Sequence, residues 1–119
     1  MDYFGLEAAV FGPRPWTNGA TFRPGPAMCR ERCWCAAVTA GGRVIVFGGG
    51  SFAEETTELL ETQTMAFTNL PDMRSARSGC AAVQIDADRV LLVGGADGNQ
   101  RALNTTEIFH LSTRTFTAG

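Results

Sequence analysis

Short apolar runs separated by polar turns occur along most of the chain. Two runs, at residues 44–47 and 90–93, consist of β-branched or large apolar residues and lead directly into glycine pairs. A run of this length between turn signals is typical of a strand buried on both faces. We predict strands there and in the shorter apolar segments that precede them, at 36–39 and 81–85.

The turns and the later segments complete a four-strand pattern. Gly41-Gly42 and residues 86–88 are rich in residues that accept a positive φ, so they predict tight hairpin turns. Residues 54–61 have the composition of a short helix, but their counterpart at 104–110 is rich in Thr, Ile and Phe and favours a strand. We therefore predict third and fourth strands, at 57–60, 66–69, 106–109 and 115–117.

This pattern is an internal repeat. Cys35 recurs 45 positions later as Cys80, and Thr-Thr-Glu at 56–58 recurs 49 positions later at 105–107, so the additional residues fall in loops. The motif Pro-x-Met-x-x-x-Arg occurs at 26–32 and again at 71–77. We divide the chain into the tail of a preceding repeat (1–31), one repeat (32–76) and a second, nearly complete repeat (77–119). Residues 11–20, with two prolines and two glycines, are predicted to be an inserted loop.

Together these residues resemble the kelch repeat, over about two and a half copies. The shared features are the apolar strand before Gly48-Gly49 or Gly94-Gly95, the following Glu58 or Glu107, and a pair of large residues after each glutamate. Those pairs are Leu60 with Phe67 and Phe109 with Phe116, where the family usually has Tyr and Trp. The resemblance implies an all-β fold, a partial β-propeller of four-stranded antiparallel blades.

The length is small for such a fold. Propellers typically close with 4–8 blades, and even four blades of this size need roughly 180 residues. The chain has 119. We favour the explanation that it is a fragment of a larger propeller. Self-association through open blade edges and a small stand-alone sandwich are the alternatives.

Charge and composition restrict the partners. The formal net charge is −2 and all ten cationic residues are arginines, but they form no basic stripe, so we expect no nucleic acid. No apolar run approaches the roughly 18 residues of a membrane span, and the N-terminus lacks the basic region of a secretion signal. We expect a cytoplasmic protein that contacts no membrane.

The cysteines and the single histidine give little support for catalysis. Cys33-x-Cys35 differs from the Cys-x2-Cys spacing of zinc ribbons, and Cys35 and Cys80 occupy equivalent repeat positions. We interpret those two as small buried hydrophobes with free thiols, and a metal or disulfide role for Cys29, Cys33 and Cys35 as the weaker alternative. We expect no metal and no cofactor.

The loops remain as the candidate site. In a four-stranded antiparallel blade, the loops after the second and fourth strands emerge on one side, here 50–56, 69–77 and 96–104. Arginines and aromatics often anchor interfaces. The candidate partner-binding residues in these loops are Phe52, Glu54, Glu55, Arg74, Asp97, Asn99, Gln100 and Arg101. Arg32 and Arg77 recur with the repeat, so we expect them to be structural.

The functional hypothesis is a non-catalytic scaffold that binds a protein partner. The resemblance implies roles such as presenting substrates to ubiquitin ligases, binding actin or assembling signalling complexes, and the sequence does not choose among them. The alternative is part of a propeller enzyme of the copper galactose-oxidase type whose catalytic residues lie in missing blades. Such a site needs several His and Tyr ligands, and this chain has only His110 and Tyr3.

Overall fold

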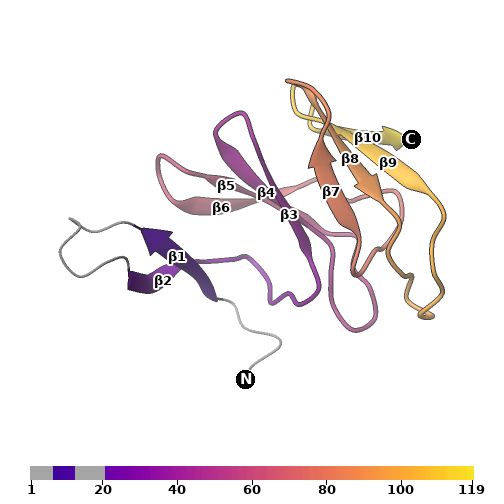
Figure 1. Ribbon diagram of the computed structural model, residues 1–119, viewed down its shortest axis with the longest axis horizontal. Coiled ribbons are helices and arrows are strands. Elements are labelled where there is room, and N and C mark those ends of the chain that lie inside the picture. The colour runs from indigo at the N-terminus through magenta and orange to yellow at the C-terminus, as the bar shows by residue number, and fades with distance from the viewer. Residues whose placement is uncertain (1–6, 13–20) are drawn as a thin grey trace.

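The computed structural model describes residues 7–12 and 21–119. These residues form β-strands joined by turns and loops, arranged in one hairpin and two four-stranded antiparallel sheets (Figure 1). The all-β prediction is confirmed. Within the described residues, no helix has the length and apolar character needed to cross a membrane.

The first sheet has the strand order β3-β4-β5-β6. Its strands are β3 (Ala36–Ala40), β4 (Arg43–Phe47), β5 (Thr57–Glu61) and β6 (Ala66–Leu70). Each strand pairs with the next one along the chain, and the Gly41-Gly42 turn between β3 and β4 has φ of 59° and 73°. The strand predicted for residues 57–60 is confirmed, and the helical alternative is wrong.

The second sheet repeats this arrangement with the order β7-β8-β9-β10. Its strands are β7 (Ala81–Gln84), β8 (Arg89–Val93), β9 (Thr106–His110) and β10 (Thr115–Ala118). All eight strands of the two sheets agree with the sequence prediction to within one residue at either end. Each sequence repeat therefore corresponds to one four-stranded sheet.

The remaining hairpin pairs β1 (Glu7–Gly12) with β2 (Thr21–Ala27). The predicted loop at 11–20 is wrong at its start, because Phe11 and Gly12 belong to β1 and pair with Phe22 and Thr21. Cross-strand hydrogen bonding outweighs the weak strand propensity of glycine at this point. The rest of that prediction, residues 13–20, lies outside the described residues.

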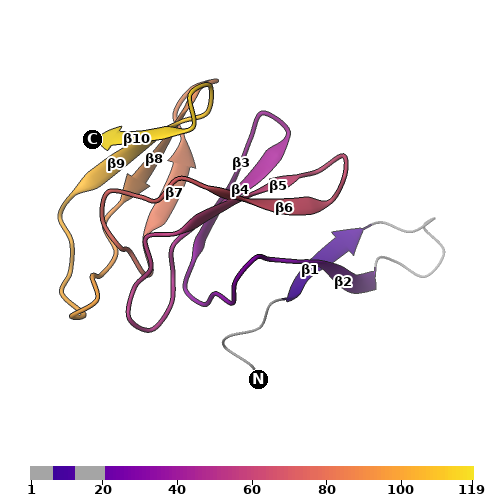
Figure 2. The same ribbon diagram turned by 180° about the vertical axis from the view of Figure 1, so that it is seen from behind.

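The hydrophobic core lies between the two sheets. Ile45, Phe47 and Leu59 of the first sheet pack against Val90, Leu92 and Phe109 of the second, and all six are buried. The ring of Phe47 meets that of Phe109 edge-on, with centroids 5.9 Å apart, and Phe116 joins this cluster. Strands β3 and β7 lie side by side where the sheets meet (Figures 1 and 2).

No sheet of the described residues covers the far face of the second sheet, which carries the same repeat positions. Val83 and Val93 have exposed fractions of 50% and 42%, and they correspond to Val38 and Phe47, which lie in or against the core. Strand alternation places Leu91 and Ile108 on this same face. The described residues thus form two units of a stack with one apolar face still open.

The two ends of the sheets differ. Tight hairpin turns at 41–42, 62–65, 85–88 and 111–114 form one end, which we call the hairpin end. Longer connections at 28–35, 48–56, 71–80 and 94–105 gather at the other end, which we call the loop face (Figures 1 and 2). The loops predicted to share one side of the blade do so.

Candidate functional site

A buried arginine–glutamate ion pair links the loop face to the first sheet. Arg32 Nε donates to Glu58 Oε2 at 2.9 Å, and both side chains are inaccessible to solvent. The Glu58 carboxylate also accepts hydrogen bonds from the backbone N–H groups of Cys29 and Arg30. A buried carboxylate requires such partners, because ionic groups removed from water are costly unless they are paired and hydrogen-bonded.

The second sheet has the same arrangement. Arg77 Nε donates to Glu107 Oε2 at 2.8 Å, with 1% and 2% of the two side chains exposed. The backbone N–H groups of Arg74 and Ser75 donate to the same carboxylate at 2.6 and 3.1 Å. The expectation that Arg32 and Arg77 are structural is confirmed, and their partners are the two glutamates of the repeat.

Arg77 also holds the two sheets together. Its backbone N–H donates to the carbonyl of Glu54, and its own carbonyl accepts from Gly49 N–H, both on the first sheet's loop 48–56. Its side chain meanwhile binds Glu107 and the carbonyls of Gly94 and Thr105 on the second sheet. Backbone and side chain of one residue therefore contact different sheets.

The glycine pair permits this close approach. Gly48 and Gly49 have φ of 60° and 98°, a region that L-residues with side chains rarely adopt. A Cβ on Gly48 would collide with the carbonyl oxygen of Arg77, and one on Gly49 with that of Cys33. The glycines thus let the loops before β3 and β7 lie directly against the end of β4.

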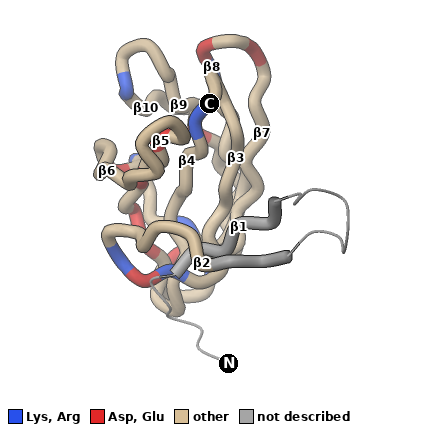
Figure 3. The backbone as a smooth tube through the Cα atoms, turned by 90° about the vertical axis from the view of Figure 1, so that its left-hand side faces the viewer, with Lys and Arg blue, Asp and Glu red and all other residues tan. Residues whose placement is uncertain are grey.

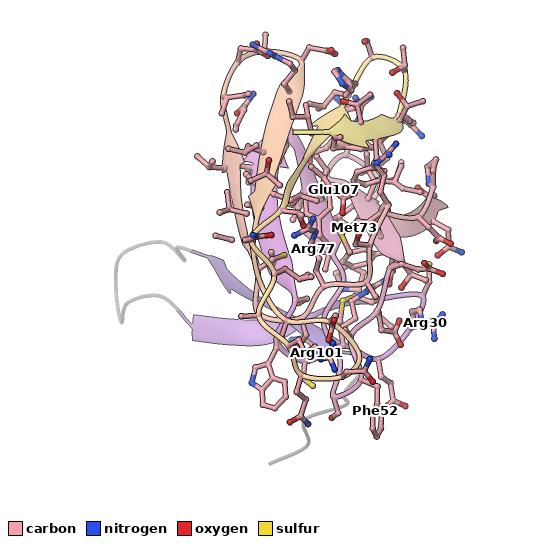
Figure 4. The ribbon with its side chains drawn as sticks, turned by 90° about the vertical axis from the view of Figure 1, so that its right-hand side faces the viewer. Arg30, Phe52, Met73, Arg77, Arg101 and Glu107 are labelled. Carbon is pink, nitrogen blue, oxygen red and sulfur yellow. The ribbon has the colours of Figure 1, made fainter. Side chains whose placement is uncertain are left out.

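Backbone hydrogen bonds join the four long connections into one continuous surface. Gly50 N–H donates to Cys33 O, Met73 N–H to Glu55 O, and Ser78 pairs with Ala96. The tip of the loop after β8 also lies close to that of the loop after β4, since a Cβ on Gly98 would be 2.9 Å from Phe52 O. In Figure 4, Arg30, Phe52 and Arg101 lie together at this end, away from the buried Arg77 and Glu107.

Each predicted partner-binding residue lies on the loop face, but they differ in availability. Asp97 stabilises its own loop, because its carboxylate accepts hydrogen bonds from the backbone N–H groups of Asn99 and Arg101. Glu54 is half-buried and pairs with Arg30, at 3.1 Å between Nε and Oε2. The exposed members of the set are Phe52, Glu55, Arg74, Asn99, Gln100 and Arg101.

Two hollows adjoin on this face. The larger, about 350 Å³, is lined by Arg30, Ala53, Glu54, Glu55, Thr56 and Ala76. The smaller, about 190 Å³, is lined by Glu31, Gly50, Ser51, Phe52, Ala53 and Glu54. Their shared wall is Ala53 and Glu54. Acidic and basic positions both occur on the loops of this end (Figure 3), so the surface offers charge together with exposed aromatic area and concave shape.

Comparison with known proteins agrees with the repeat geometry. The chain is 31% identical over 96 residues, 78% of its length, to a curated Arabidopsis thaliana protein named for an F-box and kelch repeats. The chain is built of kelch repeats. It spans about a quarter of the length of that relative, since the match covers 25% of it. No protein-family profile matches the chain.

The kelch repeats do not bury both equivalent cysteines, so that interpretation is wrong for Cys35. Strand alternation directs Cys35 and Cys80 to the same side of their sheets. That side of the second sheet packs on the first, where Cys80 is half-buried against the core, whereas Cys35 is exposed. All four cysteines are free thiols, and burial raises the pKa of the Cys80 thiol. Within the described part of the chain, no cluster of His, Cys, Asp or Glu has the form of a metal site.

Sequence reasoning missed one exposed aromatic on the loop face of these kelch repeats. Trp34 has an exposed fraction of 63%, and its backbone has a positive φ of 55°. Its carbonyl accepts a hydrogen bond from Gly79 N–H, so it lies at the junction of the two sheets. The repeat could have identified this position, because the equivalent residue 45 positions later is a glycine, Gly79.

Proposed function

We propose that the chain is a non-catalytic kelch-repeat scaffold whose loop face binds a protein partner. The observation that carries the proposal is the assembly of four separate connections into one hydrogen-bonded surface with exposed aromatic and arginine side chains. Such side chains dominate protein interfaces because they combine large contact area with directed polar contacts.

Within each repeat, the buried ion pair has a structural role and the exposed loop residues are available to a partner. Arg32, Glu58, Arg77 and Glu107 are enclosed and hydrogen-bonded within the protein, so they maintain the loop face without contacting a partner. The exposed loop residues are free to differ between repeats, as Phe52 and Gly98 do, which lie four positions after Gly48 and Gly94. Similarity to a protein named for an F-box and kelch repeats favours, among scaffold roles, an adaptor whose kelch repeats hold the partner.

Affinity capture with matched variants tests this function. We expect a protein captured from cells of the source organism by the wild-type chain to be lost with Phe52→Ala and Arg101→Ala on the loop face. The control, Met65→Ala and Arg114→Ala, removes an exposed apolar and an exposed basic side chain at the hairpin end. A partner lost only with the hairpin-end variant would contradict the proposal.

A further inference from the structure

The most informative position on the loop face is occupied differently in the two repeats. Gly79 has φ of 72° and open space where a Cβ would lie, so glycine suits that position. Trp34 occupies the equivalent position of the first repeat with φ of 55°. A left-handed backbone costs a residue with a side chain roughly 1–2 kcal/mol. The fold does not require a tryptophan side chain at this position, because the second sheet forms the same structure with glycine.

A backbone hydrogen bond joins the segment of Phe52, the other exposed aromatic of the loop face, to that of Trp34. The residue before it, Cys33, accepts a hydrogen bond from Gly50 N–H, and Gly50 lines the smaller hollow together with Phe52. Phe52 has an exposed fraction of 81%. Two large aromatic side chains thus project from neighbouring segments into solvent, although burying such side chains is among the main driving forces of folding.

The charged side chains that line the two hollows, the smaller of which is also lined by Phe52, are mostly acidic. The two adjoining hollows are lined by three carboxylates, of Glu31, Glu54 and Glu55, and by one arginine, Arg30. Arg30 pairs with Glu54, and within the described residues neither Glu31 nor Glu55 forms an ion pair. Arg74 and Arg101 are exposed on the loop face and line neither hollow, although Arg101 belongs to the loop whose tip lies next to Phe52.

We propose that Trp34 and Phe52 anchor a docking surface for an arginine-bearing segment of the partner protein. A guanidinium stacks on aromatic faces and forms bidentate pairs with carboxylates, so a surface with exposed aromatics and unpaired glutamates complements it in shape and charge. An apolar residue next to that arginine packs against the second aromatic. This inference rests on the proposed function and specifies the chemistry of the partner.

Peptide binding to the 119-residue chain tests the inference. The probe is a fluorescein-labelled synthetic peptide in which arginine and leucine alternate, and its control replaces each arginine with glutamate. We expect fluorescence anisotropy to show binding of the arginine peptide only. Trp34→Gly and Phe52→Ala should each weaken it at least about tenfold, the effect of losing an interface anchor.

A matched variant separates binding from folding. Met65 is another exposed residue with a positive φ, 56°, but it lies at the hairpin end. Met65→Gly relieves the same backbone strain and should leave peptide affinity unchanged. Both glycine variants should keep or raise the midpoint of urea unfolding.

Several outcomes would overturn the inference. These are a lowered unfolding midpoint in Trp34→Gly alone, unchanged affinity of Trp34→Gly or Phe52→Ala, equal binding of both peptides, and no binding of either. If the arginine peptide fails while capture still depends on the loop face, the chemistry of the partner is wrong and the proposed function stands. If capture is independent of the loop face, the proposed function fails as well.

Discussion

Replacing Glu107 with glutamine tests whether the buried ion pair holds the second sheet to its connecting loop. Glutamine has nearly the same shape, so packing is preserved while the charge is removed. In the wild type the carboxylate accepts hydrogen bonds from Arg77 Nε, Arg74 N–H and Ser75 N–H, at 2.6–3.1 Å. A glutamine amide has a single oxygen acceptor, and its NH₂ group must face one of these donors.

The expected loss is large because Arg77 stays buried without its counter-charge. Removing one partner of a buried ion pair costs about 3–5 kcal/mol. With a urea dependence of about 1.5 kcal/mol per molar for a domain of this size, the unfolding midpoint should fall by roughly 2–3 M. Circular dichroism across a urea series measures this shift. The loss is a large fraction of the about 5–15 kcal/mol that stabilises a typical domain.

Two further variants make the result interpretable. Glu61→Gln removes the partly exposed pair of Glu61 and Arg43, whose side chains are 34% and 41% accessible, and should cost less than about 1 kcal/mol. The double variant Arg77→Met with Glu107→Leu should not recover wild-type stability, because Arg74 N–H and Ser75 N–H lose their acceptor. Equal midpoints for Glu107→Gln and Glu61→Gln, or full recovery in the double variant, would refute the reasoning.

Three other predictions concern the glycine pair, a thiol and a hairpin. Gly48→Ala should lower the free energy of unfolding, measured in urea, by at least about 2 kcal/mol, because it combines a positive φ with a collision against Arg77 O. Gly42→Ala, which has open space around it, should lower the same free energy by only about 1 kcal/mol. Because burial raises the pKa of Cys80, its alkylation by iodoacetamide at pH 8 should be slower in the folded chain than in urea, and equal rates would contradict this. Backbone hydrogen bonds and an arginine partner lower the pKa of Asp86, so its NMR titration midpoint should lie below about 3.9. The contribution of Asp86 to stability should be complete above that pH and lost as the pH falls through the lowered value, and Asp86→Asn should remove this contribution.

The repeat made the fold predictable. Two aligned copies removed the ambiguity of residues 54–61, where composition alone favoured a helix, and located every strand of the two sheets. The repeat also identified Arg32 and Arg77 as structural. Their pairing with Glu58 and Glu107 was not predicted, although each arginine and each glutamate recurs in both copies. The pairing depends on how the connecting loop folds back onto the third strand, which no local pattern specifies.

The site was less predictable, because exposure depends on which sheet covers which face. Cys35 and Cys80 are equivalent in sequence and differ in burial, since a neighbouring sheet covers only Cys80. The loop pattern identified Phe52 but not Trp34, because tryptophan directly before a strand resembles a core residue until its positive φ is known. The partner-binding roles themselves remain predictions.

The two-sided attachment of Arg77 has a consequence for how the molecule opens. Opening the first sheet removes the hydrogen-bond partners of the Arg77 backbone, and opening the second exposes its guanidinium and Glu107. In the description used for repeat arrays, this residue supplies a nearest-neighbour coupling that is independent of apolar contact. The amides of β4 and β8 should consequently exchange with solvent deuterium through one shared opening event. The amides of the two sheets should therefore show similar protection from exchange.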